Sequence, residues 1–176
     1  MERASWQFFR LRPANFAPLR IAQGACWLAP DGLLHRDPLL ILADAARQPK
    51  PLKHLRSCLV AQPSLFWNTH VHLAKPCKPR QPKLGRRRID TLILNAVLPA
   101  LLLHADQTQQ PDLIDAVEAV LRALPPENDH ITRLFTELDT KPKHALMAQG
   151  LHQLYRTRCT EGRCLSCAVG KHVLGM

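Results

Sequence analysis

The chain has 176 residues, 46% of them hydrophobic, which is enough for a single buried core. Its 24 Lys and Arg residues outnumber its 14 Asp and Glu residues, and the formal net charge of +10 favours a polyanionic partner, nucleic acid first, although such an excess can also be solvated surface. Aromatic residues make up only 5% of the chain, which argues against a platform on which single-stranded bases stack.

The N-terminal stretch from Trp6 to Leu11 is aromatic but also basic. Arg10 and Arg12 interrupt it, so the apolar core of a secretory signal does not form. We therefore expect a cytoplasmic protein whose six cysteines are reduced or bind metal.

Hydrophobic spacing predicts three helices in the first third of the chain, near residues 18–29, 38–47 and 51–61. Pro18 suits a first helical turn, and Asp37 can cap the second helix. The segment 66–73 then alternates in the way that is typical of a short strand, which would turn its two histidines, His70 and His72, to one side. A His-x-His pair can bind metal, but ordinary hydrogen-bonding groups are the simpler interpretation, because no carboxylate follows nearby.

A basic, proline-rich loop is expected at residues 74–88. It contains seven basic residues, three prolines and no acid, so an extended conformation with its side chains facing water or phosphate is predicted. We take its cations as candidate nucleic-acid ligands that would contact phosphates without reading sequence, or else as part of a solvated linker. The candidates are Lys75, Lys78, Arg80, Lys83, Arg86, Arg87 and Arg88.

The helix that follows from Ile89 is apolar on all sides, which predicts central burial and a kink at Pro99. Its hydrophobic stretch, residues 91–105, is shorter than the roughly 20 residues that span a bilayer, so we expect no membrane association. A hydrogen bond from Asn95 to a carbonyl that Pro99 frees is as good an explanation of that residue as a catalytic role.

Three more helices are expected in the last third of the chain. The first runs from Pro111 to Leu124, and the second is short and capped by Asn128 or Asp129. The last runs from about residue 143 to 158 and leads into a cysteine-rich end.

Three cysteines near the C-terminus, Cys159, Cys164 and Cys167, have the spacing C-x4-C-x2-C, and Gly162 lets the chain reverse between them. If His172 is the fourth ligand, zinc is favoured, whereas Cys77 as the fourth ligand would favour an iron–sulfur cluster. Cys58 and Cys26 are more distant candidates. The simpler alternative is three reduced thiols, with Cys164 and Cys167 packed as small hydrophobic groups and Cys159 partly exposed.

These patterns predict a mostly α fold: a compact domain of about six helices with a small C-terminal knuckle. The helical body would be residues 1–158, with the basic loop at 74–88, and the knuckle residues 159–176.

Several of these segments, in the same order, resemble a family of bacterial proteins catalogued as domain of unknown function 2851, in its C-terminal half. The segments are Arg12-Pro13-Ala14-Asn15-Phe16, Arg20-Ile21-Ala22-Gln23, Trp67-Asn68-Thr69-His70, Leu84-Gly85 with Ile89-Asp90, the stretch from Ile93 to Pro99, Leu124-Pro125 with Glu127-Asn128, Gln149-Gly150-Leu151 and Cys159 to Gly170. One departure is the proline expected directly after Phe16, which stands one place later as Pro18.

The resemblance implies no activity, since the family has none assigned. It does imply longer relatives, whose N-terminal part carries an acidic, His-containing segment similar to a nuclease site. By analogy alone, some nucleases also hold their C-terminus with cysteines around an iron–sulfur cluster.

We therefore expect a non-catalytic, metal-stabilised module that associates with DNA or RNA. The alternative is the structural or protein-interaction half of a larger two-part protein, whose other part is an N-terminal domain or a partner chain. A thiol enzyme using Cys159 or Cys164 is a third hypothesis, because Arg158 and Arg163 could lower the pKa of those thiols.

Overall fold

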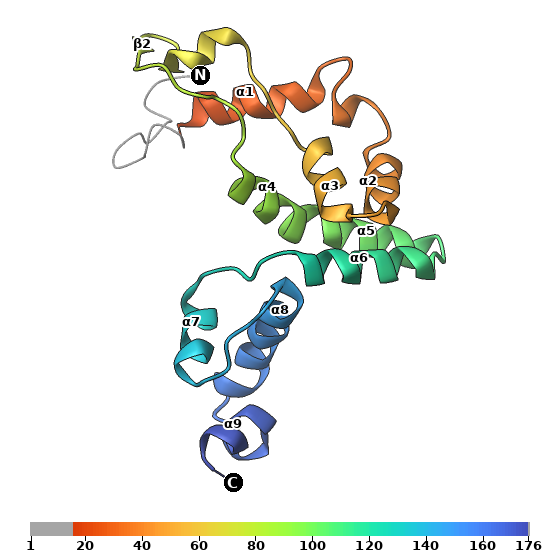
Figure 1. Ribbon diagram of the computed structural model, residues 1–176, viewed down its shortest axis with the longest axis vertical. Helices are drawn as coiled ribbons and strands as arrows, with labels where there is room; N and C mark the ends of the chain where they lie inside the picture. Colours follow the sequence, from red (N-terminus) through yellow and green to blue (C-terminus); the bar gives the residue numbers. More distant parts are fainter. Residues whose placement is uncertain (1–15, 176) are drawn as a thin grey trace. The chain divides into compact units, whose positions relative to one another are not determined.

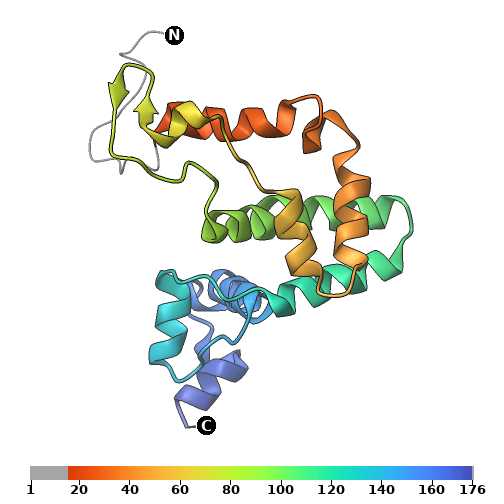
Figure 2. The ribbon, with the colours of Figure 1, turned by 45° about the horizontal axis from the view of Figure 1, so that its top comes forward.

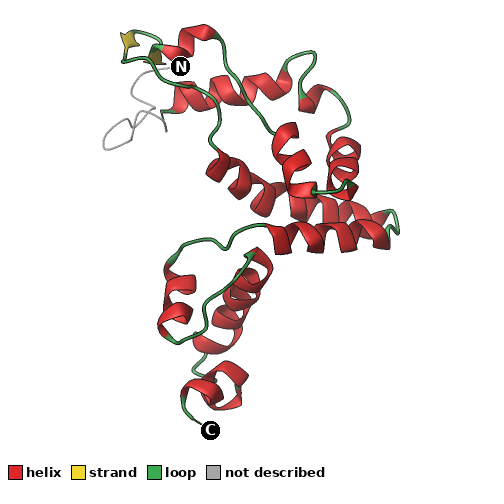
Figure 3. Ribbon diagram, viewed as in Figure 1, coloured by secondary structure: helices red, strands yellow, loops and turns green. Residues whose placement is uncertain are grey.

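The structure is a computed structural model that describes residues 16–175, except for the side chains of Val71 and Lys75. The N-terminal features predicted before Phe16 lie outside the described residues. The described chain is mostly α-helical, as predicted (Figure 3). Its described residues form two compact units, and the division along the chain falls between His104 and Ala105.

The described part of the first unit, from residue 16, holds three helices, a two-stranded hairpin and a long final helix (Figure 1). Its elements are α1 (Ala17–Leu28), α2 (Pro38–Arg47), α3 (Pro51–Cys58), β1 (His70–His72), β2 (Lys75–Pro76), α4 (Arg86–Leu92) and α5 (Leu98–Gln107), which runs into the second unit, with short 3₁₀ helices at Leu33–His35 and Leu65–Asn68. The first two helices lie where the sequence predicts them, whereas α3 ends three residues earlier than 61. Asp37 caps α2 by accepting a hydrogen bond from the Leu40 amide (3.1 Å).

The β1–β2 hairpin lies beside the start of α1 (Figure 2). The strands are antiparallel, and their register is irregular between His70 and His72. The predicted strand over 66–73 is therefore shorter than expected, because its first residues form a 3₁₀ helix instead.

The helix from Arg86 to Gln107 is continuous, but its middle turn, Ile93–Val97, is a wider π-turn. This irregularity ends two residues before Pro99, whose ring crowds the preceding turn and which has no N–H to donate. The Asn95 side chain donates to the Thr91 carbonyl oxygen (3.0 Å), whereas the predicted acceptor was a carbonyl that Pro99 frees, which would lie four residues before the proline.

This helix was expected to be buried on all sides, and that expectation is wrong for part of its surface. Ile93, Leu98 and Leu101 are buried, but Leu102 and Leu103 are exposed. By length and composition, the 22-residue helix could cross a membrane, and it is the one described helix of that kind. The core helix of a globular domain meets the same criterion, and we interpret it as such because it supplies buried side chains to its unit.

The second unit contains four helices, α6 (Pro111–Ala123), α7 (His130–Glu137), α8 (Ala145–Leu154) and α9 (Ala168–Val173), in its described part. Part of its core is Ile131, Phe135 and Leu151, against which Cys159 and Val169 pack. Residues 159–175 therefore contribute side chains to this unit. The division into a body at residues 1–158 and a knuckle at 159–176 stays a prediction.

Two caps fix the ends of α7 and α8. Asp129, one of the two predicted caps, accepts hydrogen bonds from the Ile131 and Thr132 amides (2.8 and 3.0 Å), and the Thr132 hydroxyl accepts one from the Asp129 amide in return. His144 caps α8 by accepting from the Met147 amide (3.2 Å). Beyond α8 the chain continues as a π-turn to Cys159, close to the predicted helix end at 158.

Candidate nucleic-acid interface

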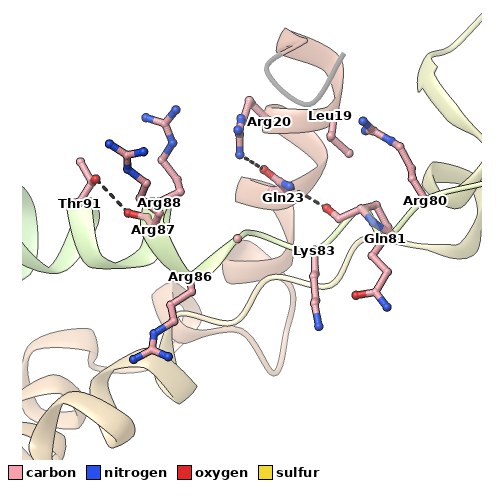
Figure 4. A pocket seen from close by; sticks show the side chains of 12 residues that line it. Leu19, Arg20, Gln23, Arg80, Gln81, Lys83, Arg86, Arg87, Arg88 and Thr91 are labelled. Carbon is pink, nitrogen blue, oxygen red and sulfur yellow. Dashed lines mark hydrogen bonds between the residues drawn. The ribbon is translucent and has the colours of Figure 1, made fainter. Parts of the chain in front are cut away.

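A concave, strongly basic pocket of about 750 Å³ lies in the first unit, between α1, the loop 77–85 and the start of α4 (Figure 4). We call it the basic pocket. Its lining residues are Leu19, Arg20, Gln23, Arg80, Gln81, Pro82, Lys83, Gly85, Arg86, Arg87, Arg88 and Thr91. Six of these twelve residues are cationic and none is acidic.

Helix α1 contributes Arg20 and Gln23, which share a face because they are three residues apart. Gln23 is 3% exposed, accepts a hydrogen bond from Arg20 Nη1 (2.7 Å) and donates one to the Pro82 carbonyl oxygen (2.7 Å). One buried amide therefore orients an arginine and ties the loop to α1.

The loop 77–85 is anchored at several points along its backbone. The Cys77 amide donates to the Thr69 carbonyl oxygen (2.7 Å), and the Arg80 amide donates to the Asn68 carbonyl oxygen (2.8 Å). Pro82 and Leu84 are buried, which corrects the expectation that all side chains of this segment face water or phosphate. The predicted loop at 74–88 is shorter in the structure, because β2 takes up Lys75–Pro76 and α4 begins at Arg86. Between them the segment 77–85 is neither helix nor strand, and its contacts are not those of a solvated linker.

The arginines at 86–88 form the first turn of α4, whose N-cap residue, Gly85, has no side chain to cap it. Arg87 and Arg88 extend to the same side of the loop as Arg20 and Arg80, whereas Arg86 extends to the other side (Figure 4). All three of these tandem arginines are exposed. Positive charge is unfavourable at a helix N-terminus, so this turn gains stability when an anion binds near it.

The charges in the pocket repel one another. Partial burial lowers the pKa of Arg20, and the nearby cations Arg88 and Arg80 lower it further. The Nε and Nη2 atoms of Arg80 are buried and have no hydrogen-bond partner within the described part of the chain. The acidic residue closest in sequence, Asp90, is bound to Arg56. The arrangement can hold a polyanion that supplies the missing acceptors.

Five of the seven cations predicted from the sequence line this pocket: Arg80, Lys83, Arg86, Arg87 and Arg88. Lys78 is exposed and is not among the lining residues, and the side chain of Lys75 lies outside the described residues. Sequence reasoning missed Arg20 and Gln23 as site residues. Their three-residue spacing on a predicted helix was a signal, but nothing local in the sequence places that helix beside the loop.

The three C-terminal cysteines line one small pocket of about 210 Å³ in the second unit, together with apolar side chains such as Phe135 and Val169. Cys159 ends the π-turn, Cys164 begins a 3₁₀ helix (Cys164–Ser166) and Cys167 precedes α9. Gly162 has φ +67°, so the predicted chain reversal between Cys159 and Cys164 is present.

The thiols differ in exposure. Cys167 is buried, Cys159 is half-buried and Cys164 is exposed, which corrects the alternative in which Cys164 is packed. Burial raises the pKa of Cys159, and the neighbouring Cys164 and Cys167 raise it further. A nucleophilic thiol needs a lowered pKa, so Cys159 does not have the electrostatics that the thiol-enzyme hypothesis requires.

The predicted fourth ligands are not part of this pocket's lining. His172 is exposed on α9, and Cys77 belongs to the first unit. Among the described residues, no group of three or more His, Cys, Asp or Glu side chains is arranged to hold a metal ion. The metal site therefore stays a prediction.

The His70–His72 pair is engaged locally. His70 Nδ1 contacts the Phe66 carbonyl oxygen (3.1 Å) and its ring stacks on Phe66, with 4.0 Å between ring centroids. His72 Nδ1 accepts a hydrogen bond from the Ala74 amide (3.2 Å). These contacts agree with the interpretation of both residues as ordinary hydrogen-bonding groups.

The chain matches the family model of a protein of unknown function (DUF2851) over residues 1–130. The matched range includes all residues of the basic pocket and ends before the three C-terminal cysteines. No curated protein and no solved structure matches the chain.

Proposed function

The chain belongs to the DUF2851 family of proteins of unknown function, and we propose that it is a non-catalytic, cytoplasmic module that binds the phosphate backbone of nucleic acid through the basic pocket. The observation that carries this function is the pocket's composition: six cations and no carboxylate, on three segments held together by Gln23 and the anchored loop. Cations grouped in this way repel one another until an anion neutralises them.

The chemistry of the pocket favours contact with phosphates over base readout. Arginine guanidinium groups match phosphate oxygens in geometry, and each contact releases a counterion from the nucleic acid. Such contacts position a nucleic acid without selecting its sequence. We therefore expect strong salt dependence and little sequence preference.

The test is a salt titration of binding to labelled single- and double-stranded DNA and RNA. The wild-type protein is compared with Arg86, Arg87, Arg88→Ala. A matched variant, Lys141, Lys143, Arg156→Ala, removes three exposed cations from the second unit and so lowers the net charge of +10 by the same three charges.

We expect wild-type affinity to fall steeply as the salt concentration rises. The slope of log affinity against log salt concentration should be smaller in magnitude by about two to three for Arg86, Arg87, Arg88→Ala. The second-unit variant should keep most of the wild-type slope. If both variants lost the same amount of affinity and of salt slope, this would contradict the basic pocket as the interface. Absence of binding at every salt concentration would leave the alternative, a structural or protein-interaction half of a two-part protein.

A bound metal at Cys159, Cys164 and Cys167 is the second part of our proposal. It is supported by the three thiols lining one pocket and by the chain reversal at Gly162, and it requires the side chains to close on the ion. Bound there, zinc or an iron–sulfur cluster would clamp the C-terminal segment.

Metal content and the visible spectrum of anaerobically purified protein test this second part. The triple Cys159, Cys164, Cys167→Ser variant is compared with Cys26→Ser, which removes a thiol from the first unit. If the protein contains iron and sulfide, Cys77→Ser is the next variant, because Cys77 is the predicted fourth ligand of a cluster. If it contains one zinc, the next variant is His172→Ala. A folded wild-type protein that holds no metal would contradict the site.

A further inference from the structure

The Arg80 side chain is the strongest indication of a specific ligand in the first unit. Its Nε and Nη2 atoms are buried, and neither has a hydrogen-bond partner among the described residues. A buried guanidinium without an acceptor is destabilising, so native proteins pair such groups with protein, water or ligand. The Arg80 amide donates to the Asn68 carbonyl oxygen, so the backbone that carries this side chain is anchored.

Three arginines from three separate segments act together here. Arg20 on α1, Arg80 on the loop and Arg88 on α4 all line the basic pocket, and Arg80 and Arg88 are close enough to Arg20 to lower its pKa. A phosphodiester carries one negative charge, whereas a phosphate monoester carries about 1.5 to 2 at neutral pH and three free oxygens. Three guanidinium groups that line one pocket therefore match the charge and the free oxygens of a terminal phosphate better than those of an internal one.

A second pocket, of about 490 Å³, adjoins the first and shares Arg20, Gln23 and Arg88 with it. Its remaining lining residues are Gly24, Trp27, Leu84 and Leu92, so it is apolar apart from the shared edge. The indole Nε1 of Trp27 is buried and has no partner among the described residues. An aromatic surface beside a phosphate site suits a nucleobase, which contacts an indole either by stacking on its face or by accepting its N–H.

We propose that the two adjoining pockets form one site for the phosphorylated end of a nucleic-acid strand. Arg20, Arg80 and Arg88 hold the terminal phosphate, and Trp27 contacts the terminal base. This inference rests on the proposed nucleic-acid function and narrows its ligand to strand ends. The low aromatic content of the chain is compatible with it, because a single end site needs only one stacking residue.

The test compares binding of short single strands that differ only at one end: a phosphate or a hydroxyl at the 5′ end, and a phosphate or a hydroxyl at the 3′ end. We expect one phosphorylated end to bind at least about tenfold more tightly than its hydroxyl form, consistent with charge-assisted contacts. A strand whose terminal nucleotide lacks its base should lose part of this gain.

Single-residue variants test the phosphate contact and the base contact of the site separately. Arg80→Ala should abolish the preference for a phosphorylated end, whereas Lys53→Ala, an exposed cation on α3, should keep it. Trp27→Leu should remove the effect of the terminal base, and Leu28→Ala, its exposed neighbour on α1, should not. Trp27→Phe keeps a stacking ring but removes the indole N–H. The effect of the terminal base can be measured in this variant if Trp27→Leu does not fold.

Equal affinity for phosphorylated and hydroxyl ends, with binding still lost in Arg86, Arg87, Arg88→Ala, would overturn the end site and leave the general nucleic-acid function standing. If removing the terminal base weakens binding by Trp27→Leu as much as it weakens binding by wild type, the base contact would be overturned. No binding of any strand would overturn both the site and the function on which it rests.

Discussion

Arg56 and Asp90 form a two-point ion pair that joins α3 to the first turns of α4. Arg56 Nε donates to one carboxylate oxygen at 2.6 Å and Nη2 donates to the other at 2.9 Å. The side chains are 18% and 16% exposed, so water screens the pair only partly. Because α4 begins with the pocket arginines, this pair fixes the helix that carries them.

The first prediction concerns that pair. Asp90→Ala should lower the free energy of unfolding by about 1.5 to 3 kcal/mol, because it leaves a partly buried guanidinium without its acceptors. Glu118→Ala is the matched control, since Glu118 pairs with Arg122 on an exposed face of α6 and should contribute at most about 0.5 kcal/mol. Denaturant unfolding of both variants measures the difference, and similar losses would show that the Arg56–Asp90 pair adds little.

The second prediction concerns Asp129, which caps α7 and contacts His152 Nε2 at 2.9 Å. Partial burial by itself raises the pKa of Asp129, but the Thr132 amide, the His152 imidazole and the Ile131 amide together outweigh it, so the pKa is lowered. Asp129→Ala should lower the free energy of unfolding by about 1 to 2 kcal/mol at neutral pH.

The sign of its pH dependence follows from the lowered pKa. A carboxyl whose pKa is lower in the folded state stabilises the protein above its unfolded pKa, about 3.9, and loses that contribution as pH falls through the folded value. The stability difference between wild type and Asp129→Ala should therefore shrink below about pH 4. Thermal unfolding at several pH values measures it. A difference that grows as the pH falls would contradict the lowered pKa.

Sequence patterns predicted the helices well because local signals mark their ends. Pro18, Asp37, Pro111 and Asp129 are each a helix-start residue, and each stands at the start of an observed helix. The 3₁₀ helix at 65–68 was missed, since an aromatic, β-branched run resembles a strand until tertiary packing decides between them.

The site was predictable only in part, for a reason that Arg20 illustrates. The cations at 80–88 lie in one short segment, so composition alone grouped them. Arg20 is far from them in sequence, and it joins them because Gln23 hydrogen-bonds to Pro82, 59 residues away. Periodicity identifies the face of a helix that is buried but not its neighbour.

The third prediction tests Gln23 as a positioning residue. Gln23→Leu keeps the volume of the side chain but removes the donor to Pro82 and the acceptor for Arg20, so it should destabilise the fold by about 1 to 3 kcal/mol. It should also weaken nucleic-acid binding at a salt concentration where the variant is fully folded, with little change in the salt slope, because every cation remains. Unfolding and binding are measured on the same preparation. A variant with wild-type affinity would contradict a positioning role.

The fourth prediction contrasts two glycines of the second unit. A Cβ at Gly170 would collide with the Cys164 carbonyl oxygen and its neighbouring backbone atoms, whereas a Cβ at Gly150 on α8 would meet nothing within 4 Å. Gly150→Ala should raise the free energy of unfolding by about 0.5 to 1 kcal/mol through helix propensity, and Gly170→Ala should lower it by about 1 to 3 kcal/mol.

The collision at Gly170 can also be measured locally, by alkylation of Cys167, because this residue is 6% exposed and directly precedes α9. Pushing α9 away from Cys164 should expose the Cys167 thiol, so Cys167 should be alkylated faster in Gly170→Ala than in wild type. The alkylation rate of Cys164, which is already exposed, should change little. Mass spectrometry of native protein after timed alkylation measures both rates. Unchanged alkylation of Cys167, together with wild-type stability, would mean that the close packing of Gly170 on Cys164 does not hold this segment.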